Sequence, residues 1–116
     1  MKKIEQRNRR RRGIRKKIFG KSKRPRLSVF RSNRYLYVQV VDDENHITKV
    51  GLSDYHLLKD PKSGSKSQRA EKLGQKLGKK LIDMEIKKIV FDRGGYRYLG
   101  RIKALAEGLR SVGIIF

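Results

Sequence analysis

The fold of this chain is decided by one stretch, RLSVFRSNRYLYVQVVDD, at residues 26–43. Apolar and polar residues alternate in its first part, and residues 35–41 are rich in aromatic and β-branched side chains, which favours strands. The small polar residues between the two parts, at 32–34, are typical of a turn. The stretch therefore predicts a β-hairpin.

A third strand is predicted directly after the hairpin. Residues 42–45 form a polar turn, and Ile47, Val50 and Leu52 follow it at strand spacing. The three strands would then make an antiparallel meander. Residues 52–64 show no clear period and are predicted to form a loop.

An amphipathic helix follows the loop. Ser65 and Gln68 have the spacing of a capping box, and apolar residues at helical spacing continue as far as Met84. Gly74 and Gly78 lie on the apolar face, where each costs about 1 kcal/mol of helix propensity relative to alanine. We therefore expect these glycines to let the helix approach the sheet closely.

The remaining residues predict a buried strand at 86–91, a Gly- and Tyr-rich loop at 92–100, and a second helix that ends at Gly113. Residues 114–116 are expected to add a short strand. The resulting order is β-β-β-α-β-α-β. Since parallel neighbours need a crossover, this order predicts an α/β fold, a mixed-sheet α/β sandwich whose crossovers are covered by helices.

The charge of the chain is large and uneven. Its 116 residues include 32 Lys and Arg against 11 Asp and Glu, a formal net charge of +21. Fourteen of the basic residues and a single acid lie in residues 1–26, with few apolar residues among them. Such a segment becomes ordered only when it meets its partner. We expect a flexible basic N-terminal arm at residues 1–23 and a single α/β RNA-binding domain at residues 24–116.

The composition also excludes classes of protein. The absence of Cys excludes a disulfide framework or a thiolate metal site and favours a reducing compartment such as the cytoplasm. The apolar runs are too short for a membrane span or a secretion signal, so we expect a soluble protein with no membrane partner. The positive charge indicates a polyanion, with nucleic acid as the first partner to consider. No cofactor is expected.

Two segments of the predicted domain are candidate RNA contacts. The loop at 92–100 follows a strand, at the sheet edge where α/β folds usually bind ligands. Its arginines would meet phosphates, its tyrosines offer stacking faces, and its glycines let an RNA backbone approach. An ordinary tight turn with solvated arginines explains the same residues, and both interpretations stay open. The second segment is the tip of the hairpin.

The candidate residues share positive charge, hydrogen-bonding capacity or a small size. In the arm they are Arg9, Arg10, Arg11, Arg12, Arg15, Lys16 and Lys17. In the loop and the helix that follows they are Arg93, Gly94, Tyr96, Arg97, Tyr98, Gly100 and Arg101. In and before the hairpin they are Arg24, Arg26, Arg31, Ser32, Asn33 and Arg34, whose arginines are expected to bring the charge of the arm onto one end of the sheet.

Functions of other classes remain possible from the residues alone. A general RNA chaperone or nucleoid-like binder would explain the charge. A metal-dependent nuclease would need carboxylates at strand ends, for which the candidates are Asp42, Asp43, Glu71 and Asp92. Asp92 is more simply an anchor for backbone N–H groups or for a neighbouring arginine. His46 and His56 have no second ligand at metal spacing, so no metal site is predicted.

Three parts of the chain closely resemble the bacterial-type family of large-subunit ribosomal protein number eighteen, which binds 5S ribosomal RNA. They are RPRLSVFRSNRYLYVQVVDD (24–43), the helix with Ala70, Gly74 and Gly78, and KKIVFDRGGYRYLGRIKALAEGLRSVGIIF (87–116). The resemblance implies an α/β sandwich with a basic arm and a structural protein without catalytic activity. It further implies binding to 5S rRNA, to 23S rRNA and to neighbouring 5S-binding ribosomal proteins in the central protuberance of the large ribosomal subunit.

The resemblance extends over essentially the whole chain, with two departures. Leu99 stands where the family usually has His, and residues 51–64 lack the Ser/Thr-rich sequence common there. A cytoplasmic ribosome is expected, and an organellar one is compatible with the same residues.

Overall fold

The computed structural model of this protein describes residues 20–55 and 64–116. Four strands form one sheet in the order β3-β2-β1-β4. They are β1 (Arg26–Arg31), β2 (Leu36–Asp42), β3 (Ile47–Ser53) and β4 (Val90–Asp92). The first three form the predicted antiparallel meander, and β4 pairs in parallel with β1. The predicted mixed sheet is therefore confirmed.

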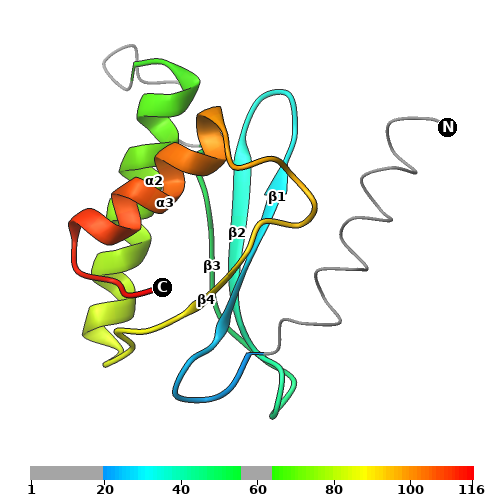
Figure 1. Cartoon of the computed structure of the whole chain (residues 1–116), viewed down its shortest axis with the longest axis vertical. Helices are drawn as coiled ribbons and strands as arrows, with labels where there is room; N and C mark the ends of the chain where they lie inside the picture. The colour runs from blue at the N-terminus through cyan, green and yellow to red at the C-terminus, as the bar shows by residue number, and fades with distance from the viewer. Residues whose placement is uncertain (1–19, 56–63) are drawn as a thin grey trace, which may run out of the picture.

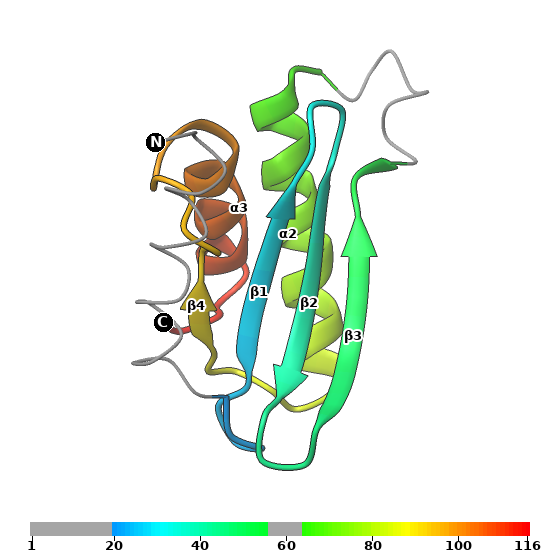
Figure 2. The same cartoon turned by 90° about the vertical axis from the view of Figure 1, so that its right-hand side faces the viewer.

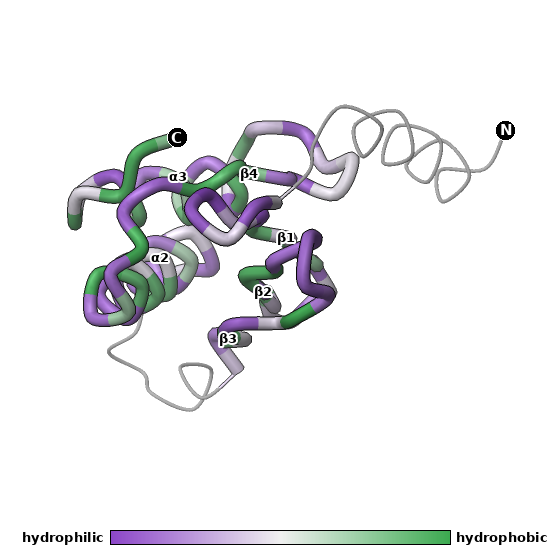
Figure 3. Tube along the Cα trace, turned by 90° about the horizontal axis from the view of Figure 1, so that it is seen from below, coloured by the Kyte–Doolittle hydropathy of each residue, from purple (hydrophilic) through white to green (hydrophobic). Residues whose placement is uncertain are grey.

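Two helices, α2 (Lys66–Asp83) and α3 (Gly100–Ser111), cover one face of this sheet (Figure 1). The capping box that begins α2 is confirmed, because the Ser65 hydroxyl accepts from the Gln68 amide and the Gln68 side chain accepts from the Ser65 amide. Seen from below, the helices form one layer and the strands the other (Figure 3). The side chains between the layers form the core, chiefly Leu27, Val29, Val38, Val40, Leu73, Leu77, Leu81, Ile102, Leu105 and Leu109.

The helix glycines face a different neighbour from the one predicted. An added Cβ at Gly74 would lie 2.3 Å from the carbonyl oxygen of Leu105, and one at Gly108 would lie 2.3 Å from that of Glu71. At Gly78 the nearest atom would be a methyl group of Val112, at 2.2 Å. The expectation of a close approach to the sheet was therefore wrong: the glycines bring α2 and α3 against each other.

The fourth strand begins later than predicted. Glu85 adopts a left-handed conformation (φ 63°), and the Ile86 amide donates to the carbonyl oxygen of Leu81, so both residues terminate α2 and do not begin a strand. Pairing with β1 starts only at Val90. At Ile86, strand composition was therefore outweighed by the need to satisfy the last carbonyl groups of the helix, and Lys87 to Ile89 pair with Ile115 instead of β1.

The predicted last strand is reduced to a single bridge. Lys88 pairs with Ile115 in parallel, and the Ile115 amide donates to the carbonyl oxygen of Lys87. Gly113 has a φ of 99°, as expected of a residue that ends a helix. Within residues 20–55 and 64–116, no helix has the length and apolar character needed to cross a membrane.

Candidate nucleic-acid interface

The hairpin tip, residues 32–35, is held by its own serine. The Ser32 hydroxyl donates to the carbonyl oxygen of Tyr35 and accepts from the Tyr35 amide, at 3.0 and 3.1 Å. The Ser32 amide also donates to the carbonyl oxygen of Tyr35. These bonds commit Ser32 to the turn, while Asn33 and Arg34 are exposed at its end.

The loop between β4 and α3 is shaped by Asp92 and two glycines. Asp92 is fully buried, and its Oδ1 accepts from the Gly94 amide at 2.9 Å. Gly94 and Gly95 have φ values of 63° and 80°, and a Cβ at Gly94 would lie 2.8 Å from the carbonyl oxygen of Val29. Gly94 therefore serves a close contact inside the protein. Gly100 differs, because a Cβ there would meet no atom within 4 Å.

One residue of this loop and one of α3 contact the hairpin. The Arg31 amide donates to the Tyr96 hydroxyl at 3.2 Å, and that hydroxyl lies 3.3 Å from the carbonyl oxygen of Arg31, to which it donates. The Arg31 guanidinium also lies over the Tyr96 ring, 4.9 Å from its centroid. Arg101 donates from Nη2 to the carbonyl oxygen of Ser32 at 2.7 Å. The two predicted RNA segments, which are far apart in the sequence, thus lie side by side at the upper end of the sheet (Figures 1 and 2).

The surface formed there is rich in exposed cations. Four exposed arginines belong to the two segments, and we call them the arginine surface: Arg31, Arg34, Arg93 and Arg97. Tyr96 is buried and Tyr98 and Arg101 are half-buried. Burial, followed by the charge of the neighbouring Arg31, lowers the pKa of Arg101 below that of a free arginine. An approaching anion would relieve this mutual repulsion, so the site favours negatively charged groups.

Asp54 and Arg69 also belong to this end of the sheet, and sequence reasoning missed both. Asp54 Oδ1 accepts from the Leu36 amide at 2.8 Å, and its Oδ2 lies 4.0 Å from Arg69 Nε. Asp54 directly follows β3 but lies in the stretch predicted to be a loop without defined structure. Its position next to a strand end is the signal that could have identified it.

One expectation about the hairpin arginines was wrong. Arg26 begins β1 and Arg31 ends it, so they lie at opposite ends of the sheet, about 17 Å apart along the strand. Arg24 lies next to Arg26 and donates from Nε to the carbonyl oxygen of Ile89 at 3.2 Å. The arginine surface therefore does not continue into Arg24 and Arg26.

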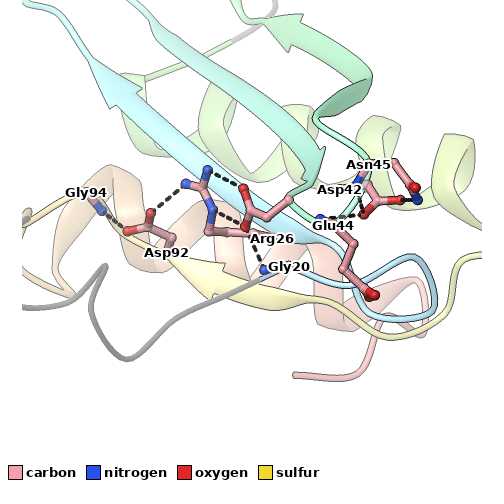
Figure 4. A network of polar contacts seen from close by, with 8 residues as sticks. Gly20, Arg26, Asp42, Glu44, Asn45, Asp92 and Gly94 are labelled. Carbon is pink, nitrogen blue, oxygen red and sulfur yellow. Dashed lines mark hydrogen bonds and ion pairs between the residues drawn. The ribbon is translucent and has the colours of Figure 1, made fainter.

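Arg26 is the centre of a polar network at this lower end (Figure 4). It donates from Nε and Nη2 to the two carboxylate oxygens of Asp43, at 3.0 and 3.1 Å, and from Nη1 to Asp92 Oδ2 at 2.9 Å. The hydrogen bond with Asp43 raises the pKa of Arg26, although partial burial opposes it. The Gly20 amide also donates to Asp43, at 2.6 Å. The network ties the start of the described chain, β1 and the loop after β4 together.

Three of the four carboxylates of the nuclease alternative, Asp42, Asp43 and Asp92, have internal partners, and the fourth, Glu71, is exposed on α2. Asp92 binds Arg26 and the Gly94 amide, which confirms that it is an anchor. Asp42 accepts hydrogen bonds from Ser22 and Asn45, and the bond from the Asn45 side chain does most to lower the pKa of Asp42. Across the described residues no three His, Asp or Glu side chains are grouped so that they could hold a metal ion. His56 and the arm candidates Arg9, Arg10, Arg11, Arg12, Arg15, Lys16 and Lys17 lie outside the described residues.

Comparison with known proteins agrees with these motifs. Residues 1–116 match the family described as ribosomal L18 of archaea, bacteria, mitochondria and chloroplast. The large ribosomal subunit protein uL18 of Thermotoga petrophila is 48% identical to this chain over 120 residues, covering 98% of this chain and 95% of that protein. The proteins of the same name from Clostridium botulinum and Bacillus cereus are 46% and 44% identical, each covering 89% of this chain and 86% of the relative. The chain belongs to the ribosomal L18 family.

Proposed function

We propose that this chain is a structural protein of the large ribosomal subunit in the cytoplasm, where it binds 5S rRNA and has no catalytic activity. We further propose that it helps attach 5S rRNA to 23S rRNA in the central protuberance, beside the other 5S-binding ribosomal proteins. Membership of the ribosomal L18 family supports the proposal, as do the names of the relatives, which place those proteins in the large subunit.

The observation that carries the proposal is the arginine surface. Its four guanidinium groups come from two distant segments, and the bonds from Tyr96 and Arg101 to the hairpin fix those segments relative to each other. A fixed pattern of cations fits the phosphates of one folded RNA better than those of any polyanion, because RNA is recognised largely by its shape.

We divide the predicted RNA residues by their surroundings. The exposed side chains of the arginine surface, together with Asn33, would contact RNA directly. Tyr96, Arg101 and Gly94 would position the hairpin and the loop, and Arg26 would hold the lower end of the sheet. The arm would add phosphate contacts, which supply affinity without selecting a sequence.

Measuring the selectivity of binding tests the arginine surface. Arg93→Ala is expected to weaken binding to 5S rRNA more than binding to an unrelated duplex of equal length. Lys79→Ala is the matched control, because it removes the same charge from an exposed position on α2. A wild-type protein that binds both RNAs equally would identify a general RNA chaperone. Equal losses on both RNAs in Arg93→Ala would exclude a selective role for Arg93.

The arm is tested by salt dependence. Replacing residues 9–12 with alanine removes four charges and is expected to weaken binding to every RNA. A plot of log affinity against log salt concentration has a negative slope, and its magnitude should decrease by roughly 3–4, since each phosphate contact contributes about 0.9. An unchanged slope would show that these arginines do not anchor RNA.

The absence of catalysis is tested by incubating labelled RNA with the protein and Mg²⁺ or Mn²⁺. We expect no cleavage above that of a mock-purified sample. Sustained cleavage that disappears in a folded Asp92→Asn variant would support the nuclease alternative and contradict the proposal.

A further inference from the structure

The face of the sheet turned away from the helices carries two exposed aromatic side chains. Phe30 on β1 and Tyr37 on β2 are direct partners in the strand register and are 51% and 37% exposed. Their neighbours Val29 and Val38 point to the opposite face and are buried in the core. No helix among the described residues covers this face (Figures 1 and 2).

The pose of Tyr37 depends on a residue without a side chain. An added Cβ at Gly51 of β3 would lie 2.8 Å from the Tyr37 hydroxyl oxygen and 3.5 Å from Cζ. The phenol therefore reaches from β2 to β3 and places its hydroxyl end over Gly51. Gln39 Nε2 donates to that hydroxyl at 3.2 Å. Gly51 and Gln39 thus hold the Tyr37 ring against the sheet instead of letting it project into solvent.

We propose that Phe30 and Tyr37 form a stacking platform for unpaired bases of the bound RNA. Exposed aromatic rings bind bases by their faces, and open sheet faces in RNA-binding proteins use this arrangement. In the register of β1 and β2, the pair directly precedes Arg31, the last residue of β1. The platform therefore adjoins the part of the arginine surface that the hairpin contributes. The net charge of the chain, +21, favours a polyanion over a protein as the partner of this face. The inference rests on the proposed function, because the RNA used to test it is 5S rRNA.

The first test removes the aromatic faces and keeps an apolar side chain. Phe30→Leu and Tyr37→Leu in the full chain are each expected to weaken binding to 5S rRNA about tenfold, the effect of losing one stacked base. The salt slope should stay unchanged, because no phosphate contact is lost. Tyr37→Phe keeps the ring and should bind within about twofold of wild type. Circular dichroism and thermal melts show that each variant is folded.

The second test moves the ring without removing it. Gly51→Ala is expected to weaken binding, because the new methyl group would contact the Tyr37 hydroxyl too closely. Adding Tyr37→Phe to Gly51→Ala removes that oxygen and leaves only the ordinary 3.5 Å contact with Cζ, so the double variant should recover most of the affinity. A defect of Gly51→Ala that does not arise from the Tyr37 hydroxyl would not be repaired in this way, and thermal melts of the single variant show whether the clash affects folding instead of binding.

The outcomes separate the two proposals. If wild-type protein does not bind 5S rRNA, the proposed function fails. If wild-type protein binds and both leucine variants bind equally well, the platform is refuted. It is also refuted if the leucine variants lose the same affinity for a fully paired duplex, which offers no free bases. Leucine variants that bind 5S rRNA normally but fail to enter the large subunit would show that this face serves a contact other than 5S rRNA and likewise overturn the inference.

Discussion

The contact between α2 and α3 makes a quantitative prediction about stability. In a solvated helix, Gly→Ala stabilises by about 1 kcal/mol. At Gly74 the added methyl carbon would lie 2.3 Å from the carbonyl oxygen of Leu105 and 3.0 Å from the amide nitrogen of Leu109, whereas ordinary contact begins at 3.4 Å. Both obstacles are backbone atoms of α3, which cannot rotate out of the way. Gly74→Ala must therefore push the helices apart by about 1 Å, which is overpacking.

Overpacking costs typically 1–3 kcal/mol, and a rigid obstacle places this site at about 3. After the gain in helix propensity, Gly74→Ala should lower the free energy of unfolding by about 2 kcal/mol. Gly108→Ala should behave alike, because its methyl carbon would lie 2.3 Å from the carbonyl oxygen of Glu71. Urea unfolding followed by circular dichroism measures the change, with a lower midpoint and an unchanged m-value expected.

Gly78 provides the matched control within the same helix. Its added methyl would meet a side-chain methyl group of Val112 and no backbone atom at comparable distance. Gly78→Ala should therefore cost less than Gly74→Ala, and combining it with Val112→Ala should cost less than the sum of the two single changes. If Gly74→Ala unfolds at the same or a higher urea concentration than wild type, the reasoning about helix contact is wrong.

Three further perturbations test the polar contacts and the helix start. In the RNA-free protein, Arg26→Ala should lower the free energy of unfolding by about 3 kcal/mol, because the fully buried Asp92 would lose its cationic partner. A urea midpoint equal to that of wild type would contradict this. Leu99→Ser should stabilise by about 1 kcal/mol, since exposed Leu99 caps α3 without a side-chain hydrogen bond; an unchanged or lower melting temperature would argue against it. The pKa of Asp42 is lowered in the folded state, so the stability that its ionised carboxylate contributes is complete above pH 3.8 and disappears as the pH falls through the lowered pKa. The stability difference between wild type and Asp42→Asn should therefore shrink in acid. A difference independent of pH would show that it does not come from the ionised carboxylate.

Local patterns predicted the elements well because their causes are local. The alternation in residues 26–43 and the capping box at Ser65 depend on neighbours a few positions away, and the structure confirms the hairpin and the start of α2. The apolar period of α2 also identified Gly74 and Gly78 as buried. It could not say what they would face, since a period defines one side of a helix and not the element that packs there.

The candidate site was less predictable because its geometry depends on long-range pairs. Nothing near Tyr96 in the sequence indicates that its hydroxyl will bond to the backbone of Arg31, sixty-five residues away. Arg26 and Arg34 look equivalent in the sequence, as arginines in or beside the same hairpin. Only the structure shows that Arg26 binds Asp43 and Asp92 while Arg34 is exposed.

The placement of the aspartates explains how so basic a chain combines a defined fold with an exposed positive charge. Asp42, Asp43, Asp54 and Asp92 all lie at or next to strand ends, and each accepts hydrogen bonds from the backbone or from a neighbouring side chain. These carboxylates satisfy loop amides and, through Asp43 and Asp92, neutralise Arg26. Asp42, Asp54 and Asp92 are buried and Asp43 is half-buried, whereas the four arginines of the arginine surface are exposed. The same few acidic residues therefore hold the loops in place and leave the opposite charge outside, where a phosphate backbone would meet it.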